Sequence, residues 1–271
     1  MSFRMLARAA ALIALGAIGG AGCDGCDHGG FDAGLPDRPI VGGGFSLAWS
    51  VQDQTTSAAV SCDKLDPNAS VFVEAKGPSG SVESFSCKNL MGASTMQLTP
   101  GVYIFSYELH LGSIAIPADN NQPGVVIRSG ETTALPPTSF KVNANGRLEL
   151  MLHSGPSGNC VGGAGITGFA ISLEHAGGAG DTGCAPVVFN LSGGGTYSAN
   201  DCSSPSVGGC IADDVTLSVA SLPSGPYQIH VRGKKNALDC WINDDALRVP
   251  PQGQPLTRTL NLAQSAAPSC Q

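Results

Sequence analysis

The sequence predicts an all-β protein with two tandem antiparallel β-sandwich domains, stapled by disulfides, after a cleaved signal peptide and a flexible tether. Three observations lead to this prediction. Apolar residues come in short runs broken by Gly, Pro, Ser and Asn, which is typical of short strands joined by turns. Strand-like segments in the first half of the chain recur in the second half. Eight cysteines are distributed over these two halves.

The composition narrows the class of protein. Charged residues make up 13% of the 271 residues, about half of the roughly 25% that is usual for soluble domains. Gly (37) and Pro (18) together stay below the roughly 25–30% that indicates disorder. A net charge of −7 argues against a nucleic-acid surface, which needs a basic stripe. We interpret the small basic cluster of Arg232, Lys234 and Lys235 as solvated.

The N-terminal segment has the pattern of a secretory signal. Arg4 and Arg8 precede the small and apolar residues 9–22, a stretch too short for a comfortable transmembrane helix. Small residues then lead directly into Cys23. The sequence therefore predicts cleavage before Cys23 and export of the remaining chain.

The cleavage site also resembles a known motif. Gly20-Ala21-Gly22-Cys23 is similar to the lipobox of bacterial lipoproteins, whose common form has Leu where this sequence has Gly20. The resemblance implies that residues 1–22 are a lipoprotein signal peptide. It also implies that Cys23 carries lipid, including palmitate, and becomes the mature N-terminus. Ordinary cleavage that leaves a free Cys23 is the alternative.

Residues 23–43 are predicted to form the flexible tether. They are rich in Gly and Asp and show no apolar periodicity. Cys26 is left without a partner when Cys23 is lipidated. A metal cluster could be imagined here, but the spacing fits no closed zinc pattern; its members would be Asp24, Cys26, Asp27 and His28. We expect no metal site and no cofactor.

The body of the chain reads as a repeat. The matched segments are Gly44–Ser50 with Gly146–Leu152, Val71–Ala75 with Phe169–Leu173, and Leu98–Tyr107 with Leu222–Val231. Apolar residues alternate in them at least in part, as expected of strands with one buried face. We place domain 1 at residues 44–142 and domain 2 at residues 143–271.

The sharpest match has the form Leu-x-x-Gly-x-Tyr. It starts at Leu98 and ends at Tyr103 in the first unit, and it starts at Leu222 and ends at Tyr227 in the second. This element resembles the penultimate strand of immunoglobulin-like and prealbumin-like modules in bacterial envelope proteins. The resemblance implies a fold and a location and no activity.

The repeat also suggests a disulfide pattern. By equivalence of position, Cys62 pairs with Cys87 and Cys160 with Cys202. An insertion at about 177–213 holds Cys184 and Cys210, which would staple it, while Cys240 with Cys270 would fix the C-terminal tail. Eight cysteines allow 105 arrangements, so the connectivity stays open. Bridges of this kind form in oxidising compartments.

Few motifs point to chemistry. Gly163–Gly168 fits Gly-x-Gly-x-x-Gly, but a strand-like segment follows where a dinucleotide site needs a helix. No Gly-x-Ser-x-Gly elbow is present. The histidines are scattered, at positions 28, 110, 153, 175 and 230. The other candidates are Asp213-Asp214 and Asp244-Asp245 for weak cation binding, and Trp49 and Trp241 for ligand stacking. Solvated acids and Trp packing on disulfides are the favoured interpretations.

These observations lead to a functional expectation. The chain is expected to be a lipid-anchored cell-envelope protein with a structural, adhesive or protein-binding role and no evident catalysis. Its partners would be the membrane, through the lipid, and an envelope protein or glycan, bound at the insertion of about 177–213. The outer membrane or cell surface is expected rather than the inner membrane. The alternatives are a carbohydrate or small-ligand module and, more remotely, an envelope hydrolase.

Overall fold

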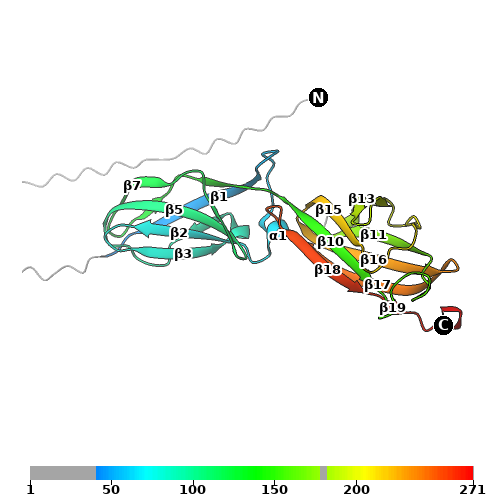
Figure 1. Ribbon diagram of the computed structural model, residues 1–271. Coiled ribbons are helices and arrows are strands. Elements are labelled where there is room, and N and C mark those ends of the chain that lie inside the picture. The colour runs from blue at the N-terminus through cyan, green and yellow to red at the C-terminus, as the bar shows by residue number, and fades with distance from the viewer. Residues whose placement is uncertain (1–40, 178–181, 271) are drawn as a thin grey trace, which may run out of the picture. The chain divides into compact units, whose positions relative to one another are not determined.

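The computed structural model describes residues 41–177 and 182–270 (Figure 1). The predicted signal peptide of residues 1–22, the predicted lipidation site Cys23, Cys26 and most of the predicted tether lie outside the described residues. The helices of the described part are one turn long; they are α1 (Cys62–Leu65), η1 (Cys87–Asn89) and η2 (Pro268–Cys270). No helix in this part of the chain is long and apolar enough to cross a membrane.

The first β-sandwich consists of two sheets. One sheet contains β1 (Gly44–Asp53), β4 (Met91–Ala93), β8 (Thr132–Ala134) and β9 (Thr138–Val142). The facing sheet contains β2 (Ser70–Lys76), β3 (Ser81–Ser86), β5 (Gly101–Leu111), β6 (Ile114–Pro117) and β7 (Gln122–Ile127). Strand β1 lies between β4 and the last two strands, and β2 and β5 form the centre of the facing sheet.

The second β-sandwich has the same plan with more strands. Its first sheet has the order β14 (Thr196–Ala199), β13 (Val187–Leu191), β15 (Thr216–Pro223), β10 (Asn145–His153) and β18 (Pro255–Asn261). Its facing sheet has the order β12 (Thr182–Cys184), β11 (Gly168–Ala176), β16 (Gly225–Lys235), β17 (Leu238–Val249) and β19 (Ala263–Gln264).

Each sandwich encloses its own hydrophobic core. In the first, alternate side chains of β1 and β5 are buried, and the core draws on residues 45–142. In the second, alternate side chains of β10 and β16 are buried, and the core draws on residues 148–262. The prediction of an all-β fold with tandem sandwiches is thereby confirmed. The boundaries at 142 and 143 remain a proposal about where independent folding units begin and end.

The strand directions differ from the prediction at one place in each sandwich. Strand β1 pairs in parallel with β8 and β9, and β10 pairs in parallel with β18. The other strand pairs are antiparallel. Hairpins produce antiparallel neighbours, so a parallel pair requires a long connection. Here the intervening strands of the sandwich make up the connection, because the last strand returns to lie beside the first strand, or, in the second sandwich, β18 returns to lie beside β10.

The Leu-x-x-Gly-x-Tyr elements form the same corner in both sandwiches. The Tyr103 hydroxyl donates to the Thr99 carbonyl at 2.8 Å, and the Tyr227 hydroxyl donates to the Pro223 carbonyl at 2.8 Å. This bond to a carbonyl four residues upstream is the tyrosine corner of β-sandwich proteins. The element is not penultimate, however, since both β17 and β18 follow β16.

The disulfides follow the repeat, but two predicted pairs are wrong. The structure pairs Cys62 with Cys87 and Cys240 with Cys270, as expected. It pairs Cys160 with Cys210 and Cys184 with Cys202, in place of Cys160 with Cys202 and Cys184 with Cys210. In the first sandwich, Cys87 precedes β4, which lies beside the first strand, β1. Its counterpart in the second sandwich is the cysteine that precedes the antiparallel strand beside β10. That strand is β15 in the second unit, and Cys210 precedes it.

The cysteine error arises from the segment interpreted as an insertion. Much of the segment 177–213 is not an exposed excursion, because β13 and β14 form a hairpin within the second sandwich and bury Phe189 and Tyr197. Three of its glycines, Gly193, Gly194 and Gly195, form the hairpin turn, where Gly194 and Gly195 adopt φ values of +94° and +86°. Such values favour glycine, so a Gly-rich composition marks a tight turn here.

The described end of the predicted tether is also ordered. Gly43 exchanges two backbone hydrogen bonds with Leu98, at 2.9 and 2.8 Å. A Cβ atom on Gly43 would lie 2.2 Å from the Arg128 carbonyl oxygen. Glycine therefore serves close backbone packing at this position, and the first sandwich already includes the last tether residue.

Candidate functional site

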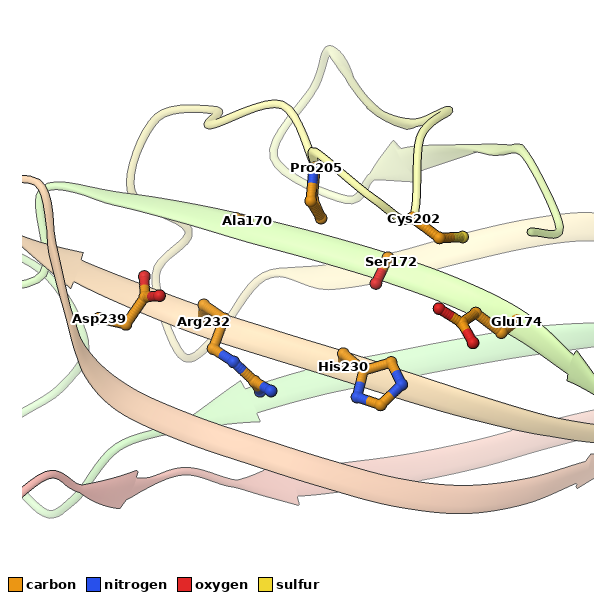
Figure 2. A pocket seen from close by; sticks show the side chains of 8 residues that line it. All are labelled: Ala170, Ser172, Glu174, Cys202, Pro205, His230, Arg232 and Asp239. Atoms are coloured by element: carbon orange, nitrogen blue, oxygen red, sulfur yellow. The ribbon is translucent and has the colours of Figure 1, made fainter. Parts of the chain in front are cut away.

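A groove lies on the outer face of the sheet that contains β11, β16 and β17 (Figure 2). Its volume is about 360 Å³, near the lower end of the roughly 300–1,000 Å³ of small-ligand pockets. The lining residues are Ala170, Ser172, Glu174, Cys202, Pro205, His230, Arg232 and Asp239. All of them belong to the second sandwich.

Strand β11 forms the floor of the groove. Its odd-numbered residues Phe169, Ile171 and Leu173 face the core, so Ala170 and Ser172 point to the outer face. Both are nonetheless buried, at 5% and 3% exposure. Two small side chains between larger neighbours create the depression, because the side chains on both sides extend further from the sheet.

A loop of residues 200–208, here named the wall loop, bounds the groove along β11. Val207 forms a β-bridge with Ala170, and the Gly208 N–H donates to the Phe169 carbonyl at 2.9 Å. The buried Tyr197 hydroxyl accepts from the Ile171 N–H and donates to the Ser206 carbonyl, both at 2.7 Å. Burial raises the pKa of Tyr197, so the hydroxyl keeps its proton and continues to donate.

Two further features hold the wall loop. The Cys184–Cys202 disulfide ties its start to β12. The Asp201 carboxylate accepts from the Ser203 hydroxyl and backbone N–H and from the Ser204 N–H. These hydrogen bonds, those of Ser203 above all, lower the pKa of Asp201. The loop is therefore a fixed wall in which Cys202 and Pro205 face the groove.

A row of polar side chains crosses three strands beside the floor. Ser172 of β11 lies opposite His230 of β16, and His230 lies opposite Asp244 of β17. The imidazole Nδ1 is 2.5 Å from Asp244 Oδ1, and Arg232 Nη2 is 2.8 Å from the same oxygen. In Figure 2 the Ser172 hydroxyl points toward His230.

The electrostatics of this row fix the tautomer of His230. Desolvation raises the pKa of the Asp244 carboxyl, but the hydrogen bonds from His230 and Arg232 outweigh it and hold that pKa below its ordinary value. An ionised carboxylate can only accept hydrogen bonds, so Nδ1 must carry the proton. In the neutral imidazole, Nε2 then carries the lone pair.

Three polar groups of the groove have no hydrogen-bond partner among the described residues. They are the Ser172 hydroxyl, the Glu174 carboxylate and Nε2 of His230. The charged neighbours are already neutralised, since Arg232 pairs with Asp244 and Lys234 with Asp239. The unpaired polar groups of the groove are therefore mainly hydrogen-bond acceptors, and the Glu174 carboxylate gives them one negative charge.

The Ser-His-Asp order of the row is not arranged as a nucleophilic triad. No hydrogen bond joins Ser172 to His230 within the described structure, whereas a nucleophile requires a base within reach. The Ile171 N–H points to Tyr197, so by alternation the Ser172 N–H faces β16 and is used in the sheet. The strand thus offers no free N–H pair for an oxyanion.

The aromatic candidates from the sequence are placed inside the sandwiches. Trp49 is 4% exposed, and its indole N–H donates to the Cys87 carbonyl at 3.0 Å, beside a disulfide. Trp241 is partly buried against the second core, with its N–H 3.3 Å from the Ala164 carbonyl. The four tyrosines are buried. None of these six side chains forms an exposed stacking platform.

The titratable candidates are separated. His110 contacts Phe72 and Glu108, and His175 stacks on Tyr227, so neither reaches the groove. Within the described residues no group of three His, Cys, Asp or Glu side chains could hold a metal ion; His28 lies outside them. Of the acid pairs, Asp244 joins the row, and Asp245 lies at the next register position. Arg232 and Lys234, interpreted as solvated, form ion pairs.

Sequence reasoning did not single out Ser172 or Glu174. Both lie in a segment whose apolar residues identify it as a strand, and their role depends on what lies opposite. Ser172 and His230 are far apart in the sequence, and only the register of β11 with β16 brings them together. The available signal was the alternation of small and polar residues between the core positions of β11.

The comparisons give no family. No family model matches the chain, and no curated protein matches it. Among solved structures, the Bacillus anthracis TIE protein is 12% identical with a TM-score of 0.36, over 83% of this chain and 34% of that one. The chain thus spans about a third of that protein.

Two pilins, each solved as a point mutant, are similar over nearly their whole length. The major pilin from Streptococcus pyogenes is 9% identical with a TM-score of 0.28, over 82% of this chain and 99% of that one. Shaft pilin SpaA from Lactobacillus rhamnosus GG is 10% identical with a TM-score of 0.26, over 83% of this chain and 100% of that one.

Proposed function

We propose that the chain is a lipid-anchored cell-envelope protein with a structural, adhesive or protein-binding role. Cys23 would carry the lipid, and the two sandwiches would stand outside the cytoplasm on the tether. We further propose the outer membrane or the cell surface as its location. The partner would be a protein or glycan of the envelope.

The observation that supports this proposal is the set of four disulfides, which uses all eight cysteines of the described residues. Such bridges form and persist in oxidising compartments, outside the cytoplasm. The lipobox resemblance at Cys23 agrees with export. A binding role is favoured over catalysis because the polar row of the groove has neither a serine-to-histidine hydrogen bond nor free N–H donors beside it.

The test is the intact mass of the protein extracted from membranes under non-reducing conditions. We expect cleavage before Cys23, an added diacylglycerol with acyl chains, and one thiol free for alkylation, which is Cys26. A mass that retains Met1, or cleavage without lipid, would overturn the anchor.

A matched pair of variants separates lipidation from a general cysteine effect. Cys23→Ser should leave the protein in the aqueous phase of a detergent partition, because the thioether-linked lipid is lost. Cys26→Ser removes a cysteine three residues away and should leave the protein in the detergent phase. If both variants behave alike, the anchor is not at Cys23.

A further inference from the structure

The groove beside the wall loop has an unexplained polar floor. Ser172 is 3% exposed, and its hydroxyl has no hydrogen-bond partner among the described residues. The hydroxyl oxygen itself can still be reached from the groove, since it is not among the fully buried, unpartnered side-chain atoms of the described residues. Because the hydroxyl points into the groove (Figure 2), a ligand there could supply the missing partner.

The acceptors around this floor define the ligand. The Glu174 carboxylate has no ion-pair partner in the described part of the chain, and it lies on the same face of β11 as Ser172. The Nε2 lone pair of His230 is unused, since Asp244 occupies Nδ1. Three acceptors with one negative charge match a protonated primary amine, which has three N–H donors, one positive charge and no acceptor.

The remaining walls suit the alkyl part of such an amine. Ala170, the ring of Pro205 and the disulfide sulfur of Cys202 line the groove between the polar groups. Methylene groups leave water favourably when they pack against such surfaces. Arg232 is a neighbouring cation, but its guanidinium is paired with Asp244 at 2.8 Å and bonds the carbonyls of Val231 and Asn243.

We propose that this groove binds an alkylammonium group, from a lysine side chain of a partner protein or from a free diamine. Glu174 provides the charge, and Ser172 and His230 provide the other two acceptors. This inference gives chemistry to the partner binding of the proposed function, but it rests on the groove alone. The membrane anchor can fail its mass test while the groove binds amines, and the reverse also holds.

The experiment is an NMR titration of the purified full chain with two amines. The probes are Nα-acetyl-lysine methylamide and 1,5-diaminopentane, and Nε-acetylation of the lysine probe removes its charge. We expect saturable amide shifts on β11, β16 and the wall loop with the charged probes and none with the acetylated one. Tighter binding of the lysine probe assigns a protein partner, and tighter binding of the diamine assigns a free diamine.

Variants test the individual groups. Glu174→Gln keeps the shape of the side chain and should weaken binding about tenfold, which is about 1.4 kcal/mol, because the hydrogen bond to a charged group is lost. Glu149→Gln removes the same charge from β10 of the same sandwich, where Glu149 accepts from Thr257, and should leave binding unchanged. Ser172→Val fills the floor and should abolish binding.

Fold integrity is checked by the dispersion of the amide spectrum. The Glu174 side chain makes no bond within the described structure, so its amide replacement should not affect folding. The proposal is overturned if neither charged probe produces saturable shifts, if the acetylated probe binds equally well, or if Glu174→Gln and Glu149→Gln have the same effect.

Discussion

Two tyrosines of strand β5 make a matched pair that tests how the first sandwich is stabilised. Both are fully buried, Tyr103 at 0% and Tyr107 at 1% exposure. The Tyr103 hydroxyl donates to the Thr99 carbonyl at 2.8 Å and lies 2.7 Å from the Ser79 hydroxyl. It also accepts from the Ser79 N–H at 3.2 Å. The Tyr107 hydroxyl has no partner within the described structure.

The same substitution should therefore have different effects at the two positions. Tyr103→Phe removes up to three hydrogen bonds that each contribute about 0.5–1.5 kcal/mol, so we expect a loss of about 1–3 kcal/mol. Tyr107→Phe removes a hydroxyl buried at a penalty of about 1–3 kcal/mol and keeps the ring. We expect its stability to be unchanged or to rise by about 1 kcal/mol.

The assay must report the first sandwich alone. The chain has two tryptophans, and each sandwich contains one. In a Trp241→Phe background, fluorescence comes from Trp49, whose burial at 4% exposure makes its emission sensitive to unfolding. Urea titrations then give the free energy of unfolding of this sandwich for each variant. The reasoning is refuted if Tyr103→Phe is neutral, or if Tyr107→Phe destabilises as much as Tyr103→Phe.

Three further predictions use the same assay or its counterpart in a Trp49→Phe background. Burial raises the pKa of Tyr107 to about 12, whereas in the unfolded chain the tyrosine has its ordinary pKa of about 10 and loses its proton first. The free energy of unfolding should therefore fall between about pH 10 and 12, and Tyr107→Phe should remove about 2 kcal/mol of that fall. Asn159 is fully buried with four side-chain hydrogen bonds, so Asn159→Ala should destabilise the second sandwich by about 2–4 kcal/mol, while the exposed Asn200→Ala should have little effect. Replacing the Cys160–Cys210 bridge, which closes 50 residues, by two alanines should cost about 4 kcal/mol.

The fold could be predicted because its signal is local. Alternation along β1, β5, β10 and β16 needs only neighbouring residues, and the tyrosine corner is encoded within six residues. The disulfide pairs could be predicted only in part. Choosing between Cys202 and Cys210 as the partner of Cys160 requires knowing which strand lies beside β10. That strand is β15, and the β13–β14 hairpin lies between it and β12 in the sequence. Position along the chain does not reveal it.

The groove could not be predicted because its components are properties of register. Whether Ser172 faces His230 or a residue on the opposite face depends on a shift of one position between β11 and β16. The wall loop is held by Tyr197 of a hairpin that sequence reasoning assigned to an insertion. The His230–Asp244 contact joins residues of adjacent strands whose hairpin contains a bulge at Gly233 and Lys234, so even this local pair cannot be counted off along the chain.

The two sandwiches also show why the groove occurs in one of them. When the tyrosine corners are superposed in register, Phe72 and Glu74 of β2 occupy the positions of Ala170 and Ser172. Phe72 stacks on His110 with ring centroids 4.2 Å apart, and Glu74 is satisfied by Lys76 and the Ser106 hydroxyl. In the first sandwich, Phe72 thus fills this surface and the Glu74 carboxylate is paired. In the second, the same surface carries small side chains and unpaired polar groups.

The two sandwiches also differ in what lies along this strand. In the first, β3 pairs with β2 from Ser70 to Ala75, so no loop lies along β2; in the second, β12 pairs only with Glu174–Ala176 of β11. In the second, the β13–β14 hairpin supplies Tyr197, and the chain leaving it becomes the wall loop. Small floor residues and an added wall are both needed for a depression. Their joint occurrence in the second sandwich, with an acceptor-rich lining, supports the proposed alkylammonium site there and not in the first sandwich.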